Sequence, residues 1–203
     1  MSGPQISSSR VRLFKNDSVE KLTVISPAAF AWTWSLALPL IAFAGWGKAE
    51  VSTALALMLA GLVVWSLFEY AMHRYLFHWS RDWRPLKWFV FLIHGNHHAA
   101  PGDRMRNLMP VIASWPIGGC VWAIAWLALG HAGTWLFLGF MIGYVAYDTV
   151  HFACHQLPMK SRIGMALKQH HMRHHHVDEN RNYAITALFW DSVFGTKITS
   201  LSR

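Results

Sequence analysis

The sequence predicts an all-α membrane protein whose four transmembrane helices form two hairpins. Three observations support this fold class. Of the 203 residues, 54% are hydrophobic and only 14% are charged, well below the roughly 25% that is typical of soluble proteins. The hydrophobic residues gather in four long stretches, separated by short links or polar segments. The basic residues avoid two of these links, which gives the chain a consistent orientation in a membrane.

The four apolar stretches cover residues 28–46, 51–72, 109–129 and 132–153. Each holds about 20 residues, the length that an α-helix needs to cross a hydrocarbon core. A fifth apolar run at 86–93 is too short to span and is expected to lie along the interface. The first stretch has an alternative interpretation, because Ala42, Phe43 and Ala44 resemble a signal-peptide cleavage site, although its apolar run is longer than a usual signal core.

The distribution of basic residues predicts the orientation. The links at 47–50 and 130–131 carry one basic residue, Lys48, whereas the other lysines and arginines lie in the N-terminal segment, at 73–108 and after residue 155. The positive-inside rule places these three regions, and both termini, in the cytoplasm. We therefore expect a cytoplasmic N-terminal segment at 1–27, amphipathic or disordered, and an integral-membrane domain at 28–203.

The net charge of +8 favours anionic lipid headgroups as a partner over nucleic acid, because the basic residues do not cluster as a nucleic-acid face would need. The host membrane is expected to be a bacterial inner membrane or the endoplasmic reticulum. The two cysteines, Cys120 and Cys154, lie in or near apolar segments and indicate neither a disulfide framework nor a zinc finger.

Twelve of the 13 histidines fall on the cytoplasmic side of this topology, and only His131 lies in the opposite link. Ten of them form four clusters: His73 and His78 in HRYLFH, His94, His97 and His98 in HGNHH, His151 and His155 in HFACH, and His171, His174 and His175 in HHMRHHH.

The spacing within the clusters suggests how they converge. Residues four apart share a helical face, so the pairs 94/98, 151/155 and 171/175 can each meet at one point, and His97 and His174 are expected on the same face as their neighbours. His73 and His78 are five apart and need a helix end or a broken turn between them. His131, His170 and His176 are interpreted as structural histidines or bystanders.

Ten histidines without nearby cysteine or carboxylate ligands exceed what one zinc ion uses, whereas two metal ions with about five imidazoles each would use them all. Imidazole suits iron, zinc, copper or nickel. The clusters therefore predict a di-metal site in a cytoplasmic helical cap, either a di-iron oxygenase or a zinc site. Metal transport is disfavoured, because transporters place their polar ligands near the bilayer midplane.

Residues 60–199 resemble the fatty acid hydroxylase branch of the sterol desaturase–hydroxylase superfamily. The resemblance is carried, in order, by EYAMHRYLFH, HGNHHAAPGDRMRNLMP, GYVAYDTVHFACH, HHMRHHH and NYAITALFWDSVFGT, which are similar to the catalytic domain of fatty acid 2-hydroxylases. The element from Pro101 to Pro110 and the tail from Trp190 to Thr196 are more specific to this branch than the histidines. Ala184 stands where relatives usually have glycine.

The resemblance implies an O₂-dependent, non-haem di-metal hydroxylase of a lipid acyl chain, acting at C2 of a fatty acid or of the N-acyl chain of a sphingolipid. Iron is the metal expected in the active form, and zinc is possible in isolated protein. The same ten histidines are the ligands that the family's motifs imply. The segment before the first span is too short for the cytochrome b5 domain of fungal and animal relatives, so we expect a separate electron donor, cytochrome b5-like or ferredoxin-like.

Several polar residues near the clusters are candidates for positioning ligands or substrate. Intramembrane acids are costly, and Glu69 and Asp148 share helical faces with His73 and His151, so both are expected to orient imidazoles. Tyr144 and Tyr147 are candidates for binding a lipid headgroup or for anchoring at the interface. Further candidates are Asp191, expected to brace the C-terminal segment, and Asp103, Arg104 and Arg106, expected to contact a lipid headgroup or hold their loop.

Two other functional classes remain open from the sequence. One is another oxidase of the superfamily, such as a carotenoid or sterol hydroxylase or a desaturase, since all of these share the histidine motifs. The other is a zinc-binding membrane protein without oxygen chemistry. The oligomeric state is not predicted.

Overall fold

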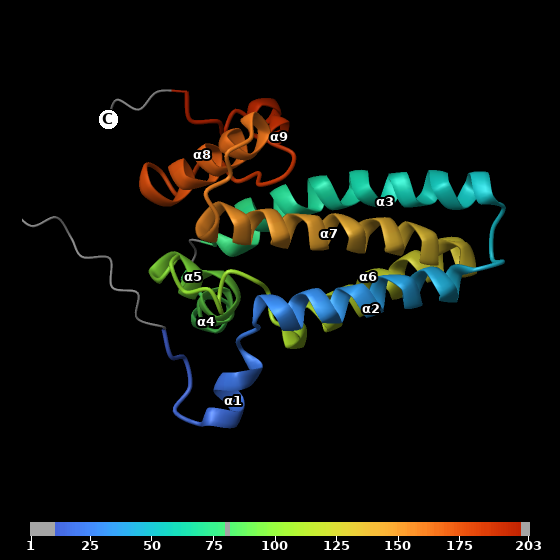
Figure 1. Cartoon of the computed structure of the whole chain (residues 1–203), viewed down its shortest axis with the longest axis horizontal. Coiled ribbons are helices and arrows are strands. Elements are labelled where there is room, and N and C mark those ends of the chain that lie inside the picture. The colour runs from blue at the N-terminus through green and yellow to red at the C-terminus, as the bar shows by residue number, and fades with distance from the viewer. Residues whose placement is uncertain (1–10, 80–81, 200–203) are drawn as a thin grey trace, which may run out of the picture.

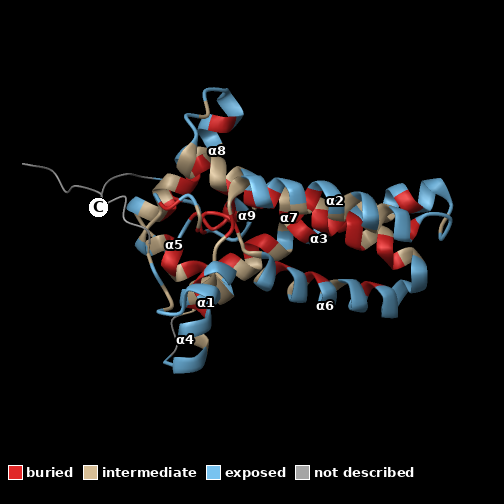
Figure 2. Cartoon of the chain, turned by 60° about the horizontal axis from the view of Figure 1, so that its bottom comes forward, coloured by how far each residue is buried: buried red, intermediate tan, exposed pale blue. Residues whose placement is uncertain are grey.

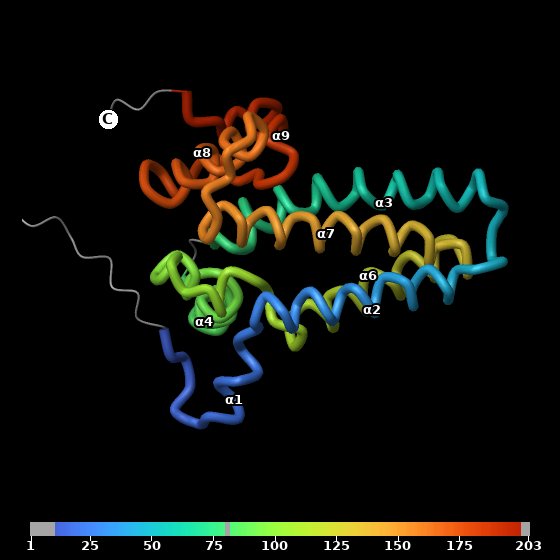
Figure 3. The backbone as a smooth tube through the Cα atoms, in the orientation of Figure 1, coloured from blue at the N-terminus to red at the C-terminus, as the bar shows by residue number. Residues whose placement is uncertain are grey.

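The computed structural model describes residues 11–79 and 82–199, and within them every regular element is helical. Four long helices run side by side, and shorter helices form a cap at one end of them (Figure 1). Both ends of the described chain lie on the cap side (Figure 3). The cap is the part of the molecule that gathers the histidines.

The four long helices are α2 (Pro27–Gly45), α3 (Val51–Ala71), α6 (Val111–Leu129) and α7 (Gly133–Gln156). Their ends agree with the four predicted stretches to within three residues. The start of α2 is set by Ser26, whose hydroxyl accepts a hydrogen bond from the Ala29 N–H, and by Pro27 in the first turn, where a missing N–H costs nothing.

Three helical stretches are long and apolar enough to cross a membrane: Pro27–Gly45, Val51–Phe77 and Val111–Gln156. The third is interrupted by a short 3₁₀ turn, η3 (Gly130–Ala132), where Gly130 has φ of +59° and the chain reverses from α6 into α7 (Figure 1). The outward faces of the long helices are largely exposed (Figure 2) and carry apolar side chains such as Leu40, Leu59 and Leu127. Such faces suit a hydrocarbon environment; the predicted arrangement of four spans in two hairpins stays a prediction.

Helix α7 is the centre of the long-helix bundle, because α2, α3 and α6 each pack against it. The contact with α3 is close enough to require glycine: a Cβ on Gly139 would lie 1.9 Å from the Met58 carbonyl oxygen, and one on Gly61 would lie 2.0 Å from the Leu136 carbonyl oxygen. Aromatic rings fill the layer nearer the cap, where Trp65 packs against Tyr144 and Tyr147. The core therefore ends directly beneath the histidines.

The cap combines seven short elements: α1 (Asp17–Leu22), η1 (Met72–Phe77), α4 (Arg84–Val90), η2 (Phe91–Gly95), α5 (Asn96–Ala99), α8 (Arg162–His176) and α9 (Phe189–Val193). The apolar run at 86–93 lies in α4 and η2. Its aromatic side chains Trp88, Phe89 and Phe91 are exposed, as an interfacial segment requires.

Part of the predicted N-terminal segment is folded against the cap. Residues 1–10 lie outside the described residues, but Glu20 in α1 is buried and pairs with Arg106 at 2.5 Å. Arg106 also donates a hydrogen bond to the Val11 carbonyl. Arg106 therefore holds its loop to the N-terminal segment, which agrees with the second of its two expected roles, while Arg104 is exposed.

The packing of α3 on α7 yields a testable prediction. Replacing Gly139 with alanine forces a methyl group into the Met58 backbone, so we expect the free energy of unfolding in detergent to fall by about 1–3 kcal/mol. Gly119→Ala on α6 is the matched control, since nothing lies within 4 Å of a Cβ there. Equal stability of the two variants would contradict this account of the helix contact.

Candidate metal centre

The ten predicted histidines form two compact groups of five. The first group, here site A, is His73, His78, His94, His98 and His174; the second, site B, is His97, His151, His155, His171 and His175. Within each group the candidate ligand nitrogens all lie within 4.8 Å of one another. Metal–nitrogen bonds of about 2.1 Å place opposite donors about 4.2 Å apart, so each group matches the donor shell of one ion.

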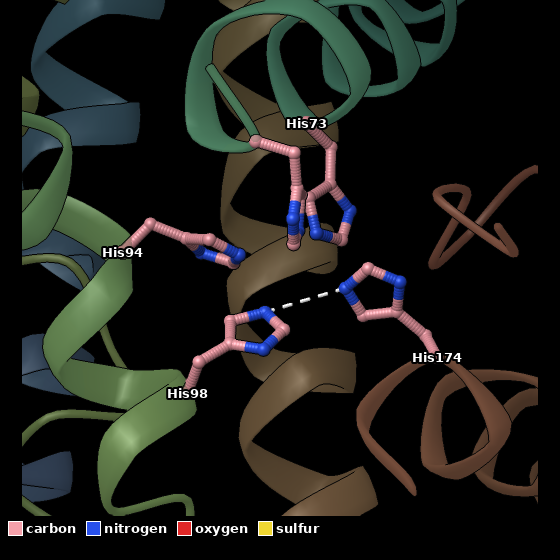
Figure 4. Close-up of side chains that lie close together, drawn as sticks. His73, His94, His98 and His174 are labelled. Atoms are coloured by element: carbon pink, nitrogen blue, oxygen red, sulfur yellow. Dashed lines mark hydrogen bonds between the residues drawn. The ribbon is translucent and has the colours of Figure 1, made fainter. Parts of the chain in front are cut away.

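Site A draws its ligands from four elements of the cap. Figure 4 shows His73, His94, His98 and His174 with their rings directed toward a common centre. They come from η1, η2, α5 and α8 respectively. The Nε2 atoms of His98 and His174 lie 3.3 Å apart.

The five-residue spacing of His73 and His78 is accommodated by a π-helix. The chain passes from α3 into η1, a π-helical turn at Met72–Phe77, in which each backbone hydrogen bond spans one more residue than in an α-helix. The rings of His73 and His78 then lie with centroids 5.1 Å apart in the same group. A second π-turn, η2, carries His94. The expected break between His73 and His78 is therefore a wider turn.

His97 and His174 each lie three residues after another histidine, and neither belongs to the same metal group as that histidine. His94 and His98 belong to site A, but His97 belongs to site B; His171 and His175 belong to site B, but His174 belongs to site A. The expectation that His97 and His174 stay with their neighbours was wrong. On an α-helix adjacent residues point about 100° apart, so each H-x-x-H-H motif reaches both sites.

The two sites adjoin each other. The His98 ring of site A stacks on the His175 ring of site B with centroids 4.2 Å apart. Two metal ions held by these groups would therefore be close neighbours, as a reaction that uses both requires.

Backbone carbonyls set the tautomers of three ligands. His73, His174 and His151 direct Nδ1 at the carbonyl oxygens of Tyr183 (2.5 Å), Arg181 (2.7 Å) and Asn107 (3.0 Å). A carbonyl oxygen can only accept a hydrogen bond, so each Nδ1 carries the proton and each Nε2 keeps a lone pair directed into its site. This is the usual outer arrangement of a metal-binding imidazole.

The residues present fit two metal ions. In site A the Nε2 atoms of His73, His78 and His94 are buried and have no hydrogen-bond partner among the described residues, which is costly unless a cation binds them. Burial also lowers the pKa of His98 to about 2 and that of His174 to about 4. The imidazoles are therefore neutral at pH 7 and their lone pairs are available.

Comparison with known proteins places this arrangement in a family. The profile described as fatty acid hydroxylase matches residues 58–196, which includes all ten histidines. The chain belongs to the fatty acid hydroxylase family. It lies in the branch of the fatty acid and ceramide 2-hydroxylases, to whose members it is 30–40% identical.

Two curated relatives illustrate the family match. The ceramide very long chain fatty acid hydroxylase of Saccharomyces cerevisiae is 40% identical over 150 residues, which are 69% of this chain and 37% of the relative. The dihydroceramide fatty acyl 2-hydroxylase of Arabidopsis thaliana is 30% identical over 194 residues, which are 93% of this chain and 81% of the relative. The chain thus spans well under half of the yeast relative and most of the plant one.

A solved structure shares the hydroxylase fold. The structure of full-length scs7p, in which only the hydroxylase domain is visible, superimposes with a TM-score of 0.85 at 29% identity and covers 94% of this chain and 73% of that chain. The helical arrangement described above is therefore that of the hydroxylase domain of a family member.

Glu69 and Asp148 are buried but form no hydrogen bond to an imidazole among the described residues, contrary to expectation. Glu69 accepts hydrogen bonds from the Ile185 and Thr186 N–H groups and from the Thr186 hydroxyl. Asp148 accepts from the Met109 N–H and the Tyr144 hydroxyl. Each carboxylate holds a loop that supplies a carbonyl to a histidine. The Nδ1 atoms of His73 and His151 bond to the backbone carbonyls of Tyr183 and Asn107 instead.

The other candidate residues occupy distinct places. Tyr147 stacks parallel to His151 with centroids 6.0 Å apart. Asp191 is buried and pairs with His170 at 2.8 Å, so His170 belongs to neither metal group but is part of the support. His176 is exposed, and His131 lies at the far end of the bundle beside Trp126.

Sequence reasoning did not find Asn107. Its carbonyl accepts from His151, and its side-chain amide lies 3.0 Å from Nδ1 of His97 and bonds to Gln156. Its position within the loop after the HGNHH motif carries no spacing signal, and main-chain carbonyls have no sequence signature at all.

The lowered histidine pKa values predict a pH-dependent stability of the metal-free protein. The pKa of His78 is lowered by burial to about 3, and those of His98 and His174 are lowered likewise, from 6.5. At a pH between these lowered pKa values and 6.5, the histidines of the unfolded chain bind protons that those of the folded chain do not. The free energy of unfolding therefore falls as the pH drops below 6.5. The unfolding midpoint of chelator-treated protein in detergent should be lower at pH 5 than at pH 7. A midpoint that is flat or rises toward pH 5 would contradict neutral, buried histidines.

Proposed function

We propose that this chain is a membrane-bound, O₂-dependent lipid hydroxylase that adds a hydroxyl group to an acyl chain, at C2 of a fatty acid or of the N-acyl chain of a sphingolipid. The observation that carries the proposal is an apolar cavity lined by two aromatic residues, Phe77 and Tyr147, that each contact a histidine of one metal group. It lies between α3 and α6 with α7 as its floor, and its lining includes Phe68, Ile117, Phe140 and Met141.

The inner end of the cavity is formed by Phe77 and Tyr147. Phe77 stacks on His94 of site A with centroids 4.8 Å apart, and Tyr147 stacks on His151 of site B. A methylene chain in this cavity would therefore end beside both metal groups. Trp65, Phe140 and Tyr147 are closely packed aromatic rings that limit the freedom of such a chain, as alignment of one C–H bond requires.

The two metal ions, with iron expected in the active form and zinc as the alternative, supply the chemistry of O₂ activation when bound. The overall reaction inserts one oxygen atom into a C–H bond and reduces the other to water, which consumes two electrons and two protons. We propose that the electrons come from a separate cytochrome b5-like or ferredoxin-like protein. The chain itself supplies the histidine ligands of the metal ions, excludes water from the cavity and aligns the acyl chain.

The proposed topology has four membrane spans in two hairpins, α2–α3 and α6–α7, with the cap and both termini in the cytoplasm. It is supported by the reversal at Gly130 and by the basic residues of the cap, such as Arg84, Lys87 and Lys160. In this arrangement the cavity opens from within the bilayer, where a lipid acyl chain resides.

Lipid mass spectrometry tests the function. Cells that express the chain should accumulate an acyl lipid heavier by one oxygen atom, labelled when ¹⁸O₂ is supplied, and fragmentation locates the new hydroxyl group. His174→Ala should abolish the product because site A loses a ligand, whereas the exposed His176→Ala should retain it. A desaturated, sterol or carotenoid product would assign another oxidase of the superfamily, and zinc binding without any oxygenated product would overturn the proposal.

The cavity yields a second prediction. Gly118 lines it, and a Cβ there would lie 3.5 Å from Sδ of Met141, so a leucine side chain would fill the space. We expect Gly118→Leu to reduce hydroxylation about tenfold or more with both metal ions retained. Gly119→Leu is the matched control, because Gly119 has open space around its Cβ position. Equal activity of the two variants would show that the acyl chain binds elsewhere.

A further inference from the structure

Asp191 is a fully buried carboxylate in α9 that touches neither metal group directly. It accepts four hydrogen bonds: from the Tyr183 N–H (2.9 Å), the Ala184 N–H (2.8 Å), the Thr196 hydroxyl (2.6 Å) and Nε2 of His170 (2.8 Å). A buried carboxylate with this many donors stays ionised, since bonds to the charged form offset its desolvation. Among its donors the Ala184 N–H has a distinct consequence.

The N–H of Ala184 and the carbonyl of Tyr183 belong to one peptide unit. The N–H donates to Asp191, and the carbonyl accepts the Nδ1–H of His73. An unbroken series of hydrogen bonds therefore runs from the carboxylate through one peptide to a ligand of site A. The His73 side chain is fully buried and directed into site A (Figure 4).

Hydrogen bonds in such a series polarise one another, by about 10–30% per bond. A negative charge on the N–H side makes the peptide carbonyl a stronger acceptor, which draws the Nδ1 proton of His73 and leaves Nε2 a better electron donor. Carboxylates that bond directly to a metal-binding histidine act in this way. We infer that Asp191 is a positioning residue that strengthens metal binding at site A through the Tyr183–Ala184 peptide.

The effect should be confined to site A. A second ligand of site A, His174, bonds to the carbonyl of Arg181. The N–H of the same peptide unit, that of Asn182, donates to the carbonyl of Thr196, whose hydroxyl in turn donates to Asp191. Site B has a different support, because its His151 bonds to the Asn107 carbonyl. The two ions are thus supported by separate carbonyl-bearing loops, and of these only the site A loop bonds to Asp191. The bond from His170 ties Asp191 to α8, which carries ligands of both sites, but it reaches no ligand ring through a peptide unit.

Stepwise zinc affinities test this inference. Purified full-length protein in detergent is stripped of metal, and Zn²⁺ binding is measured by competition with a chromophoric chelator. Asp191→Asn should lower the affinity for one of the two zinc ions by about 10–100-fold and leave the affinity for the other unchanged. The exposed Glu179→Gln removes the same charge from the surface and should match the unmodified protein at both sites.

Thr196→Val distinguishes the relay, that is, the series of hydrogen bonds from Asp191 through the Tyr183–Ala184 peptide to His73, from simple bracing of the C-terminal segment. It removes one hydrogen bond to the same carboxylate but leaves the bond from Ala184, so both zinc affinities should stay within about twofold of those of the unmodified protein. Three results would overturn the inference: unchanged affinities in Asp191→Asn, equal weakening of both ions, or an equal effect of Thr196→Val.

A measurement on the unmodified protein tests the tautomer that the inference requires, even if Asp191→Asn does not fold. In zinc-loaded protein with ¹⁵N-labelled histidine, NMR should find His73 protonated on Nδ1 and metal-bound through Nε2. A proton on Nε2 of His73 would overturn the relay. Because zinc binding is measured without turnover, the inference can fail while the proposed hydroxylase activity stands, and the reverse is also true.

Discussion

The convergence of ten uncharged imidazoles on two points, six of them buried and four half-buried, is the interaction on which the rest of the structure depends. Neutral nitrogen donors that face one another away from water need a cation between them. The surrounding chain meets this need from several directions at once. Two π-turns bring His73, His78 and His94 into place, and the two H-x-x-H-H motifs each divide their histidines between the sites.

The support of the ligands is built in layers. Carbonyl oxygens of irregular loops accept hydrogen bonds from the Nδ1–H groups of three ligands. The buried carboxylates Glu69, Asp148 and Asp191 accept hydrogen bonds from N–H groups of those loops. Asp191 therefore places negative charge one peptide unit away from the His73 ring. The ligand shells stay neutral, which favours an electrophilic metal centre, while Asp191 balances part of its charge from a distance.

Helix α7 connects the long-helix bundle to the metal site. This helix carries His151 and His155 at one end, packs against three neighbours and forms the floor of the apolar cavity. The close contact at Gly139 and Gly61 brings α3 against α7, so the histidines that follow α3 meet those at the end of α7. The cavity between α3 and α6 includes in its lining Phe77 and Tyr147, which stack on His94 and His151 of the two metal groups.

The long helices were predictable from the sequence, because apolar length is a local property of an α-helix. The ten candidate histidines lie in the two groups that could hold metal ions, and their role as ligands stays a prediction. Sequence reasoning failed for His97 and His174, whose partners lie on other elements and are chosen by tertiary packing. It also missed Asn107 and the carbonyls of Arg181 and Tyr183, since a main-chain acceptor has no side-chain signature. The contact of Glu20 with Arg106 joins residues 86 positions apart, which no periodicity predicts.

X-ray absorption spectroscopy of metal-loaded protein, combined with metal analysis, tests the central claim most directly. The account predicts two ions per chain, each with first-shell nitrogen donors at about 2.0–2.2 Å and the outer-shell scattering of several imidazole rings. A single ion per chain, or a first shell that contains sulfur or is dominated by carboxylate oxygen, would contradict it.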